Sequence, residues 1–170
     1  MYKVFFKRFF DIILALLLLI VTSPILLIVA IAIKLTSKGP IIFKQERIGR
    51  KGKVFKIYKF RSMYLDAEER KQELMSQNRV SDGMMFKLDF DPRIIGSKKL
   101  SDGTVKRGIG NFIRDYSLDE FPQFFNVLQG DMSLVGPRPP LPREVEMYDE
   151  RAMQRLLVTP GLTCYWQVQK

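Results

Sequence analysis

The stretch FFDIILALLLLIVTSPILLIVAIAI, residues 9–33, decides how this chain is built, because it is an almost unbroken run of aliphatic and aromatic side chains. A helix that crosses a lipid bilayer needs about 20 consecutive apolar residues, and this run is long enough. We therefore expect residues 1–36 to form a membrane element and residues 37–170 to form a separate cytoplasmic domain.

A proline interrupts the apolar run near its middle, at Ser23-Pro24. Proline removes one helical hydrogen bond and disturbs the preceding turn, while the hydroxyl of Ser23 can bond to the carbonyl that is set free. Each half of the run is about ten residues, which gives roughly 15 Å of helix, or about half of the hydrocarbon core. Two interpretations stay open: a re-entrant helix-break-helix, and a single span kinked at Ser23-Pro24.

Basic residues flank the run on both sides, and they favour the re-entrant interpretation. Because positively charged flanks stay on the cytoplasmic side of a membrane, both ends are expected there. Asp11 lies inside the start of the run, three residues after Arg8, and an unpaired acid would be costly at that depth. We therefore expect Asp11 to pair with Arg8 on one helix face. The flanking cations are Lys3, Lys7 and Arg8 before the run, and Lys34, Lys38 and Lys44 after it.

The composition limits the partners and the chemistry. With 28 lysines and arginines against 18 acids, the formal charge is +10, which suits lipid head groups, nucleotides or nucleic acid. Nucleic acid is not expected, because the aromatic residues are phenylalanines of the buried type rather than a stacking platform. There is no histidine and Cys164 is the one cysteine, which excludes intrachain disulfides, zinc sites with histidine and histidine-dependent nucleophiles. Any chemistry must use carboxylates, hydroxyls, lysine, arginine or a hard metal ion.

Local patterns predict an α+β fold, mainly helical, in which short β-hairpins and membrane-surface helices follow the membrane element. Residues 41–61 alternate around Gly49-Arg50-Lys51-Gly52 as a basic hairpin, and residues 98–107 form a second hairpin that turns at Asp102-Gly103. Helices are expected at residues 66–75 and 108–114.

Several cations of these elements are candidates for binding an anion. Lys59 and Arg61 end the second strand of the first hairpin together, whereas Lys51, Lys53 and Lys56 have the pattern of a solvated face. Arg107 and Arg114 lie two helical turns apart. They are equally compatible with facing a site and with facing solvent.

Two adjacent carboxylates, Asp119 and Glu120, form the most informative polar motif. Ser117 and Glu120 have the spacing of a capping box, and Asp119 can serve as the cap instead, which brings Pro122 into the tolerated first turn. In either register the carboxylates lie at a helix N-terminus, which favours anions. An ionised aspartate is a competent nucleophile at phosphorus, and Mg²⁺ commonly uses one or two carboxylates with substrate phosphate oxygens. Side by side, Asp119 and Glu120 give one residue to attack and one to hold the metal.

A proline-rich loop, Pro137-Arg138-Pro139-Pro140, follows a short segment between Gly130 and Gly136. Proline fixes φ, so Arg138 is presented by a stiff loop, and guanidinium can bind a phosphate through two hydrogen bonds. Such loops are also often only connections. The two glycines predict a tight loop, a short strand and a second tight loop.

Together these motifs resemble the bacterial sugar transferase family, the monotopic phosphoglycosyl transferases, in their small catalytic-core form. The resemblance covers almost the whole chain. It is carried by residues 7–11, Ser23-Pro24, Gly39-Pro40, residues 45–49, residues 59–63, residues 117–120 with Pro122-Gln123, and residues 126–139. Met85-Phe86-Lys87 and residues 91–94 are similar to the branch that handles hexose phosphates such as galactose or glucose. Relatives continue past Lys170, so a C-terminal cover over the site is expected to be absent.

The resemblance implies an enzyme that transfers a sugar-1-phosphate from a UDP-sugar to polyprenol (undecaprenyl) phosphate and releases UMP. It implies that Asp119 forms a covalent phosphosugar intermediate and that Glu120 binds Mg²⁺. The transfer would take place on the cytoplasmic face of the bacterial inner membrane, as a step of surface polysaccharide assembly. The resemblance does not decide whether the chain forms a homo-oligomer. The expected substrate-binding residues are Lys59, Arg61, Arg114, Pro137, Arg138 and Pro139.

The alternative from a different class is a non-catalytic basic module that binds the membrane surface through anionic lipid. It predicts that Glu120→Gln is tolerated and that binding collapses with salt.

Overall fold

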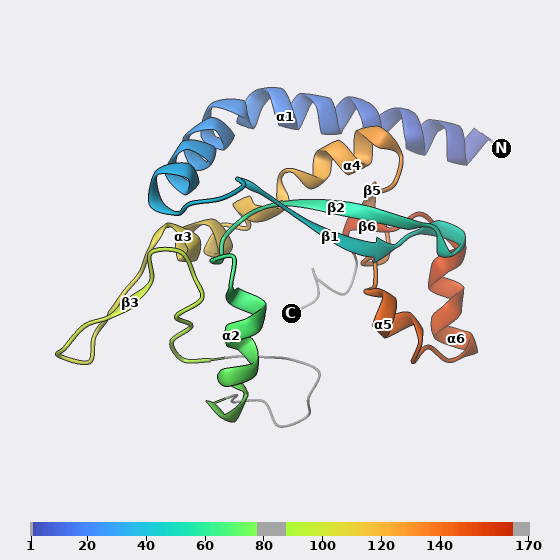
Figure 1. The fold of residues 1–170 in the computed structure, drawn as a ribbon. Coiled ribbons are helices and arrows are strands. Elements are labelled where there is room, and N and C mark those ends of the chain that lie inside the picture. The colour runs from blue at the N-terminus through green and yellow to red at the C-terminus, as the bar shows by residue number, and fades with distance from the viewer. Residues whose placement is uncertain (1, 78–87, 165–170) are drawn as a thin grey trace. The chain divides into compact units, whose positions relative to one another are not determined.

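The computed structural model of the chain describes residues 2–77 and 88–164, which mix helix and strand, with helix the larger share (Figure 1). The contacts divide the chain into two compact units. The first unit comprises residues 1–26, 42–60 and 120–170, and the second comprises residues 27–41 and 61–119.

The N-terminal helix α1 (Tyr2–Thr36) runs without interruption through Ser23 and Pro24. Pro24 has no N–H for the carbonyl of Ile20, and the hydroxyl of Ser23 donates to that carbonyl instead, at 2.8 Å. A neighbouring hydroxyl thus replaces the missing hydrogen bond, and helical structure continues through the position of the expected break. The re-entrant path stays a prediction.

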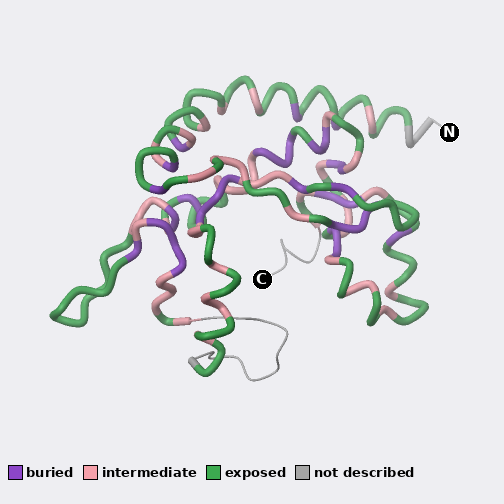
Figure 2. The backbone as a smooth tube through the Cα atoms, viewed as in Figure 1, coloured by how far each residue is buried: buried purple, intermediate pink, exposed green. Residues whose placement is uncertain are grey.

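Within the described part of the chain, one helical segment, Phe5–Thr36, is long and apolar enough to cross a membrane. Most of its side chains are exposed, as the green tube of α1 in Figure 2 shows. Leu17, Ile20, Val21 and Ile28 are each more than half exposed. An apolar surface of this size suits lipid rather than water.

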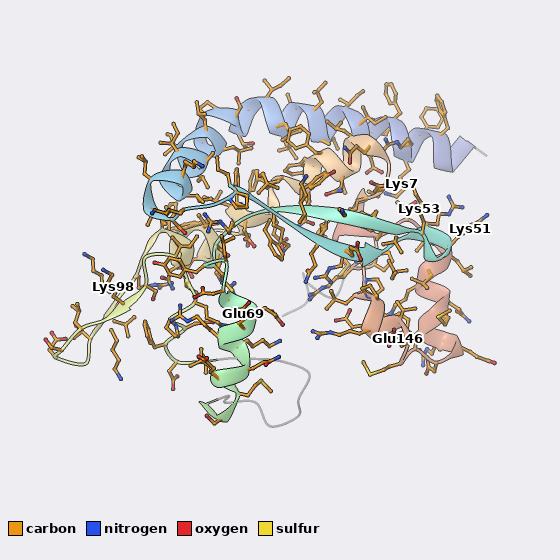
Figure 3. All side chains as sticks on the ribbon, in the orientation of Figure 1. Lys7, Lys51, Lys53, Glu69, Lys98 and Glu146 are labelled. Atoms are coloured by element: carbon orange, nitrogen blue, oxygen red, sulfur yellow. The ribbon has the colours of Figure 1, made fainter. Side chains whose placement is uncertain are left out.

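The first unit contains the expected basic hairpin. Strands β1 (Ile42–Ile48) and β2 (Val54–Phe60) pair antiparallel, with Ile42 opposite Phe60 and Ile48 opposite Val54. The short 3₁₀ turn η1 (Arg50–Gly52) joins them and takes Lys51 and Gly52 through positive φ. Lys51 and Lys53 lie exposed at this end of the hairpin, as Figure 3 shows and as the sequence predicts.

Helix α4 (Gln123–Gln129) packs against β2 and forms the core of the first unit. The core side chains are Ala15 of α1, Phe55 and Ile57 of β2, Phe124 and Val127 of α4, and Met132. Gly130 ends α4 in the left-handed conformation, with φ of 91°, which glycine adopts without a steric penalty.

Beyond Gly130, strand β5 (Ser133–Val135) pairs in parallel with β6 (Gly161–Thr163). The prediction of a tight loop, a short strand and a second tight loop is confirmed. Short helices fill the connection between the two strands: α5 (Pro142–Val145), α6 (Glu150–Met153) and the 3₁₀ turn η4 (Gln154–Leu157).

Arg8 attaches α1 to the end of α4, which lies beside the N-terminal half of α1 in Figure 1. Its guanidinium donates to the carbonyl oxygens of Val127 and Leu128, the latter at 3.0 Å. These carbonyls belong to the last turn of α4, where the helix itself offers no donors. Arg8 therefore supplies the C-terminal cap of α4.

Asp11 attaches the same helix to β5. Its buried carboxylate accepts hydrogen bonds from the Ser133 hydroxyl at 2.7 Å and from the Leu134 N–H at 3.1 Å, and Lys7 lies 3.4 Å away. The expected pair between Arg8 and Asp11 is therefore wrong. Each residue instead satisfies polar groups that lie more than a hundred residues away in sequence.

The second unit contains helices α2 (Ala67–Glu73) and α3 (Ile109–Asp115), the 3₁₀ turn η2 (Met75–Gln77), and the hairpin of β3 (Lys98–Lys99) and β4 (Val105–Lys106). Both helices and the hairpin confirm the sequence predictions. Gly103 turns the hairpin with φ of 83°, and the Asp102 carboxylate accepts from the Thr104 N–H at 2.9 Å. Met85-Phe86-Lys87 lie outside the described residues.

Candidate functional site

A pocket of about 100 Å³ opens in the first unit between the hairpin, the start of α4 and the proline loop. It brings together four residues singled out from the sequence, namely Lys59, Glu120, Arg138 and Pro139, although they come from three separate parts of the chain. The full lining is Arg47, Ile57, Lys59, Glu120, Gln123, Arg138, Pro139, Gly161 and Leu162.

Lys59 and Glu120 form an ion pair across this pocket. The Lys59 Nζ lies 2.8 Å from Glu120 Oε1, and the two side chains are 25% and 38% exposed. A pair that is this accessible to water contributes at most about 1 kcal/mol. It can therefore open and exchange partners at little cost in free energy.

The chain around Glu120 begins its helix later than the sequence predicts. Glu120 ends the 3₁₀ turn η3 (Leu118–Glu120), and α4 starts at Gln123 with Pro122 as its N-cap. Neither Ser117 nor Asp119 caps α4, so both predicted registers are wrong. Pro122 explains the difference, because its missing N–H costs nothing at a helix cap. Asp119, partly buried, directly precedes Glu120 within η3.

The proline loop is anchored through its backbone. Three of its carbonyl oxygens accept hydrogen bonds: Pro137 from the Gly161 N–H at 2.9 Å, Pro139 from Arg47 Nη1 at 3.0 Å, and Pro140 from the Ile48 N–H at 2.9 Å. The side chain of Arg138 is exposed and donates no hydrogen bond to any described residue. A stiff, tethered loop thus presents a guanidinium to the pocket, as predicted.

Arg47 is a pocket residue to which the sequence reasoning gave no role. It lies on β1, is 7% exposed, and points to the side of the hairpin that carries Gln45. Burial, followed by the charge of Arg138, holds the pKa of Arg47 below its usual value. No sequence signal separates Arg47 from the other cations of the hairpin, because its burial arises from the packing of distant segments.

Arg61, a predicted phosphate ligand, forms hydrogen bonds to Ser37 and Pro40, at the end of α1 and just after it. Its three donor nitrogens bond to the Pro40 carbonyl at 2.7 Å, the Ser37 hydroxyl at 2.9 Å and the Ser37 carbonyl at 3.0 Å. Burial lowers its pKa. Arg61 thereby fixes the chain just after α1, and its role toward phosphate stays a prediction.

For Arg107 and Arg114, the sequence left open whether the side chain faces a site or solvent. Both lie exposed in the second unit. Arg107 pairs with Asp115 at the other end of α3. Arg114 is exposed on α3, and its predicted role in substrate binding is untested.

Asp119 and Glu120 suit a metal ion whose other ligands are not protein side chains. Among the described residues there is no group of three or more acidic, histidine or cysteine side chains placed to hold a metal. A full protein cage is therefore absent from that part of the chain. Asp119 and Glu120 match the one or two carboxylates with which Mg²⁺ is commonly bound, the other positions being filled by water and phosphate oxygens.

A family model described as bacterial sugar transferase matches residues 2–170. The chain belongs to the bacterial sugar transferase family. Similar proteins include the galactosyl transferase CpsE of Streptococcus agalactiae, which is 45% identical over 162 residues, or 95% of this chain and 33% of that protein. The undecaprenyl-phosphate galactose phosphotransferase of Salmonella typhimurium is 43% identical over 168 residues, or 96% of this chain and 32% of that protein.

A shorter relative is matched over more of its length. The exopolysaccharide production protein ExoY of Sinorhizobium fredii is 39% identical over 165 residues, or 95% of this chain and 68% of that protein. The chain thus spans about a third of the two longer members of the bacterial sugar transferase family and about two thirds of this one.

Proposed function

We propose that this chain is a phosphoglycosyl transferase, which moves a sugar-1-phosphate from a UDP-sugar to polyprenol phosphate and releases UMP. The observation that carries the proposal is the pocket in which Glu120, directly preceded by Asp119, lies with Lys59 and Arg138. Adjacent carboxylates beside two cations suit phosphoryl transfer, in which catalysis is mostly positioning and neutralisation of charge. The names of the relatives, among them a galactose phosphotransferase and a glucose-1-phosphate transferase, suggest a hexose phosphate.

The proposed reaction has two steps at one phosphorus atom. A carboxylate oxygen of Asp119 attacks the phosphorus that carries the sugar, and the bond from that phosphorus to the bridging oxygen breaks, so that UMP leaves with the electron pair. A phosphate oxygen of polyprenol phosphate then attacks the same phosphorus and expels the Asp119 carboxylate. The products are UMP and a polyprenol diphosphate sugar.

The ion pair between Lys59 and Glu120 would open when the donor binds. Lys59 then donates to phosphate oxygens together with Arg138, and Glu120 becomes available to a cation. When bound by Glu120 and Asp119, Mg²⁺ would neutralise charge on the diphosphate. Lys59 and Glu120 thus neutralise each other before substrate binds. Once it is bound, Lys59 contacts the phosphate and Glu120 the cation.

The reaction is proposed to take place at the cytoplasmic face of a bacterial inner membrane. Support comes from the exposed apolar surface of α1, the basic residues at both its ends, and the polyprenol phosphate named in several relatives. A re-entrant path of α1 would keep both basic ends on that face.

The test is release of UMP without a lipid acceptor. Wild-type protein in detergent, given Mg²⁺ and UDP-galactose or UDP-glucose, should release UMP up to about one equivalent, and intact mass spectrometry should find one added hexose phosphate on Asp119. Asp119→Asn should abolish both signals. Asp115→Asn, an exposed acid four residues earlier, should leave both unchanged.

Two results would refute parts of the proposal. Turnover with lipid that survives Asp119→Asn would mean direct attack by the lipid phosphate. Wild-type protein that binds anionic vesicles but releases no UMP with any UDP-sugar would favour the non-catalytic membrane-surface module.

A further inference from the structure

Arg47 is a buried cation that is satisfied only in part. Its Nη1 donates to the Pro139 carbonyl at 3.0 Å and its Nη2 to Gln45 Oε1 at 2.7 Å, so both acceptors are neutral. Its Nε is buried and has no hydrogen-bond partner in the described part of the chain. Buried polar atoms without partners are rare in proteins and call for a specific explanation.

The positive charge of Arg47 also lacks an ion-pair partner in the described part of the chain. Within the described residues no carboxylate forms an ion pair with it. Glu144 and Glu120 favour the charge from a longer distance, but burial and the neighbouring Arg138 outweigh them. An uncompensated buried charge costs several kcal/mol, so the fold keeps Arg47 at a cost to its own stability.

The position of Arg47 shows where an anion would neutralise that charge. Side chains alternate between the two faces of a strand, and the pairing of β1 with β2 puts Arg47, opposite Phe55, on the same face as Lys59, opposite Phe43. Both residues line the pocket with Arg138. Three cations thus surround a space that holds one described carboxylate, that of Glu120.

The size of the space agrees with a phosphate group. The pocket measures about 100 Å³, whereas pockets that enclose whole ligands measure about 300–1,000 Å³. It can take one phosphate while the rest of a larger ligand extends outside.

We propose that Arg47 is a phosphate-binding residue of this pocket, and that a phosphate group of the bound substrate supplies its missing counter-ion. The identity of that substrate rests on the function proposed above. Arg47 would act with Lys59 and Arg138 as a third cation, and it would also hold the Pro139 carbonyl, so that phosphate binding and loop position are coupled.

The experiment measures the affinity of the full chain in detergent for UDP by calorimetry, with Arg47→Gln as the test variant. Glutamine keeps a polar side chain at this position but carries no charge. We expect the Kd for UDP to rise about tenfold to a hundredfold, as for a lost hydrogen bond to a charged group. Lys44→Met is the matched control, because it removes a cation from the opposite face of the same strand and should leave the Kd unchanged.

Thermal unfolding without ligand separates this role from a purely structural one. Because Arg47→Gln removes an uncompensated buried charge, its Tm without ligand should equal or exceed that of wild type, while the rise in Tm caused by UDP should shrink. Arg47→Met provides the same comparison without any polar group. A lower Tm without ligand, combined with unchanged Kd values for both UDP and the lipid phosphate probe farnesyl phosphate, would overturn the proposal.

A second probe, farnesyl phosphate, distinguishes the donor from the acceptor lipid. Weaker binding of UDP alone assigns Arg47 to the donor diphosphate, and weaker binding of farnesyl phosphate alone assigns it to the acceptor phosphate. Unchanged binding of both probes refutes the role of Arg47 and leaves the proposed function intact. Wild-type protein that binds neither probe refutes the proposed function itself.

Discussion

The backbone N–H of Tyr58 on β2 donates to the side-chain oxygen of Asn126 on α4, at 3.0 Å. The amide nitrogen of the same side chain donates to the Lys56 carbonyl at 2.8 Å, so Asn126 bonds to the free edge of β2 as a neighbouring strand would. Asn126 is fully buried. It fixes the helix that follows Glu120 against the strand that carries Lys59.

Asn126→Ala should therefore destabilise the first unit by about 2–5 kcal/mol, because it leaves the Tyr58 N–H and the Lys56 carbonyl without these partners and empties a fully buried position. Chemical denaturation in detergent, followed by fluorescence, measures the loss. Gln129→Ala, an exposed position on the same helix, is the control and should change stability by less than about 0.5 kcal/mol. Equal stability of the two variants would mean that Asn126 does not hold α4 on β2.

Arg61→Lys should lower stability without weakening UDP binding. Lysine cannot reproduce the fork of three hydrogen bonds to Pro40 and Ser37, so we expect a loss of about 1–3 kcal/mol. Arg70→Lys is the control, since the ion pair that Arg70 forms with Asp66 is loose, at 3.9 Å, and Asp66 is exposed. An unchanged free energy of unfolding with a tenfold higher Kd for UDP would instead support the predicted phosphate role of Arg61.

The carboxylate of Asp91 should make the second unit sensitive to acid. Burial by itself would raise the pKa of Asp91, but hydrogen bonds from the side chain and backbone of Arg93, with the charges of Arg93 and Arg114, hold the pKa below its usual value. The folded state thus prefers ionised Asp91. This contribution is present above the ordinary aspartate pKa of about 3.9 and is lost as the pH falls through the lower pKa of the folded state.

The Tm of wild type should therefore exceed that of Asp91→Asn at neutral pH, and the gap should close as the pH falls below about 4. Asp66→Asn, at an exposed carboxylate, should show little gap at any pH. A gap between wild type and Asp91→Asn that is independent of pH would rule out ionisation of Asp91 as its cause.

The elements that the sequence predicts well are the ones set by neighbouring residues. Both hairpins follow from turn chemistry, since Gly52 and Gly103 supply the positive φ that each turn requires. The end of α4 at Gly130 follows in the same way. The pocket residues Lys59, Glu120 and Arg138 were also predictable, because each stands in a distinctive short motif.

The parts that the sequence did not predict depend on contacts between distant segments. Spacing alone suggests that Asp11 pairs with Arg8, yet the folded chain offers each residue better partners, such as Ser133 for Asp11. Arg47 is one of many cations in a basic hairpin, and only its burial distinguishes it. Local patterns cannot report either fact, because both are created by tertiary packing.

Gly161 and Gly136 bring β5 and β6 close enough to fix the proline loop. A Cβ at Gly161 would lie 2.0 Å from the Gly136 nitrogen, which real structures do not tolerate. The N–H of Gly161 also donates to the Pro137 carbonyl, one residue before Arg138. Gly161→Ala should therefore separate the strands and release the loop.

We expect Gly161→Ala to raise the Kd for UDP at least about tenfold, since Arg138 would no longer be held over the pocket. Gly52→Ala is the matched control. It lies at positive φ in an open turn of the same unit, so it should cost about 1 kcal/mol of stability but leave the Kd unchanged. If Gly161→Ala keeps the affinity of wild type for UDP, the position of Arg138 does not depend on the contact between these two strands.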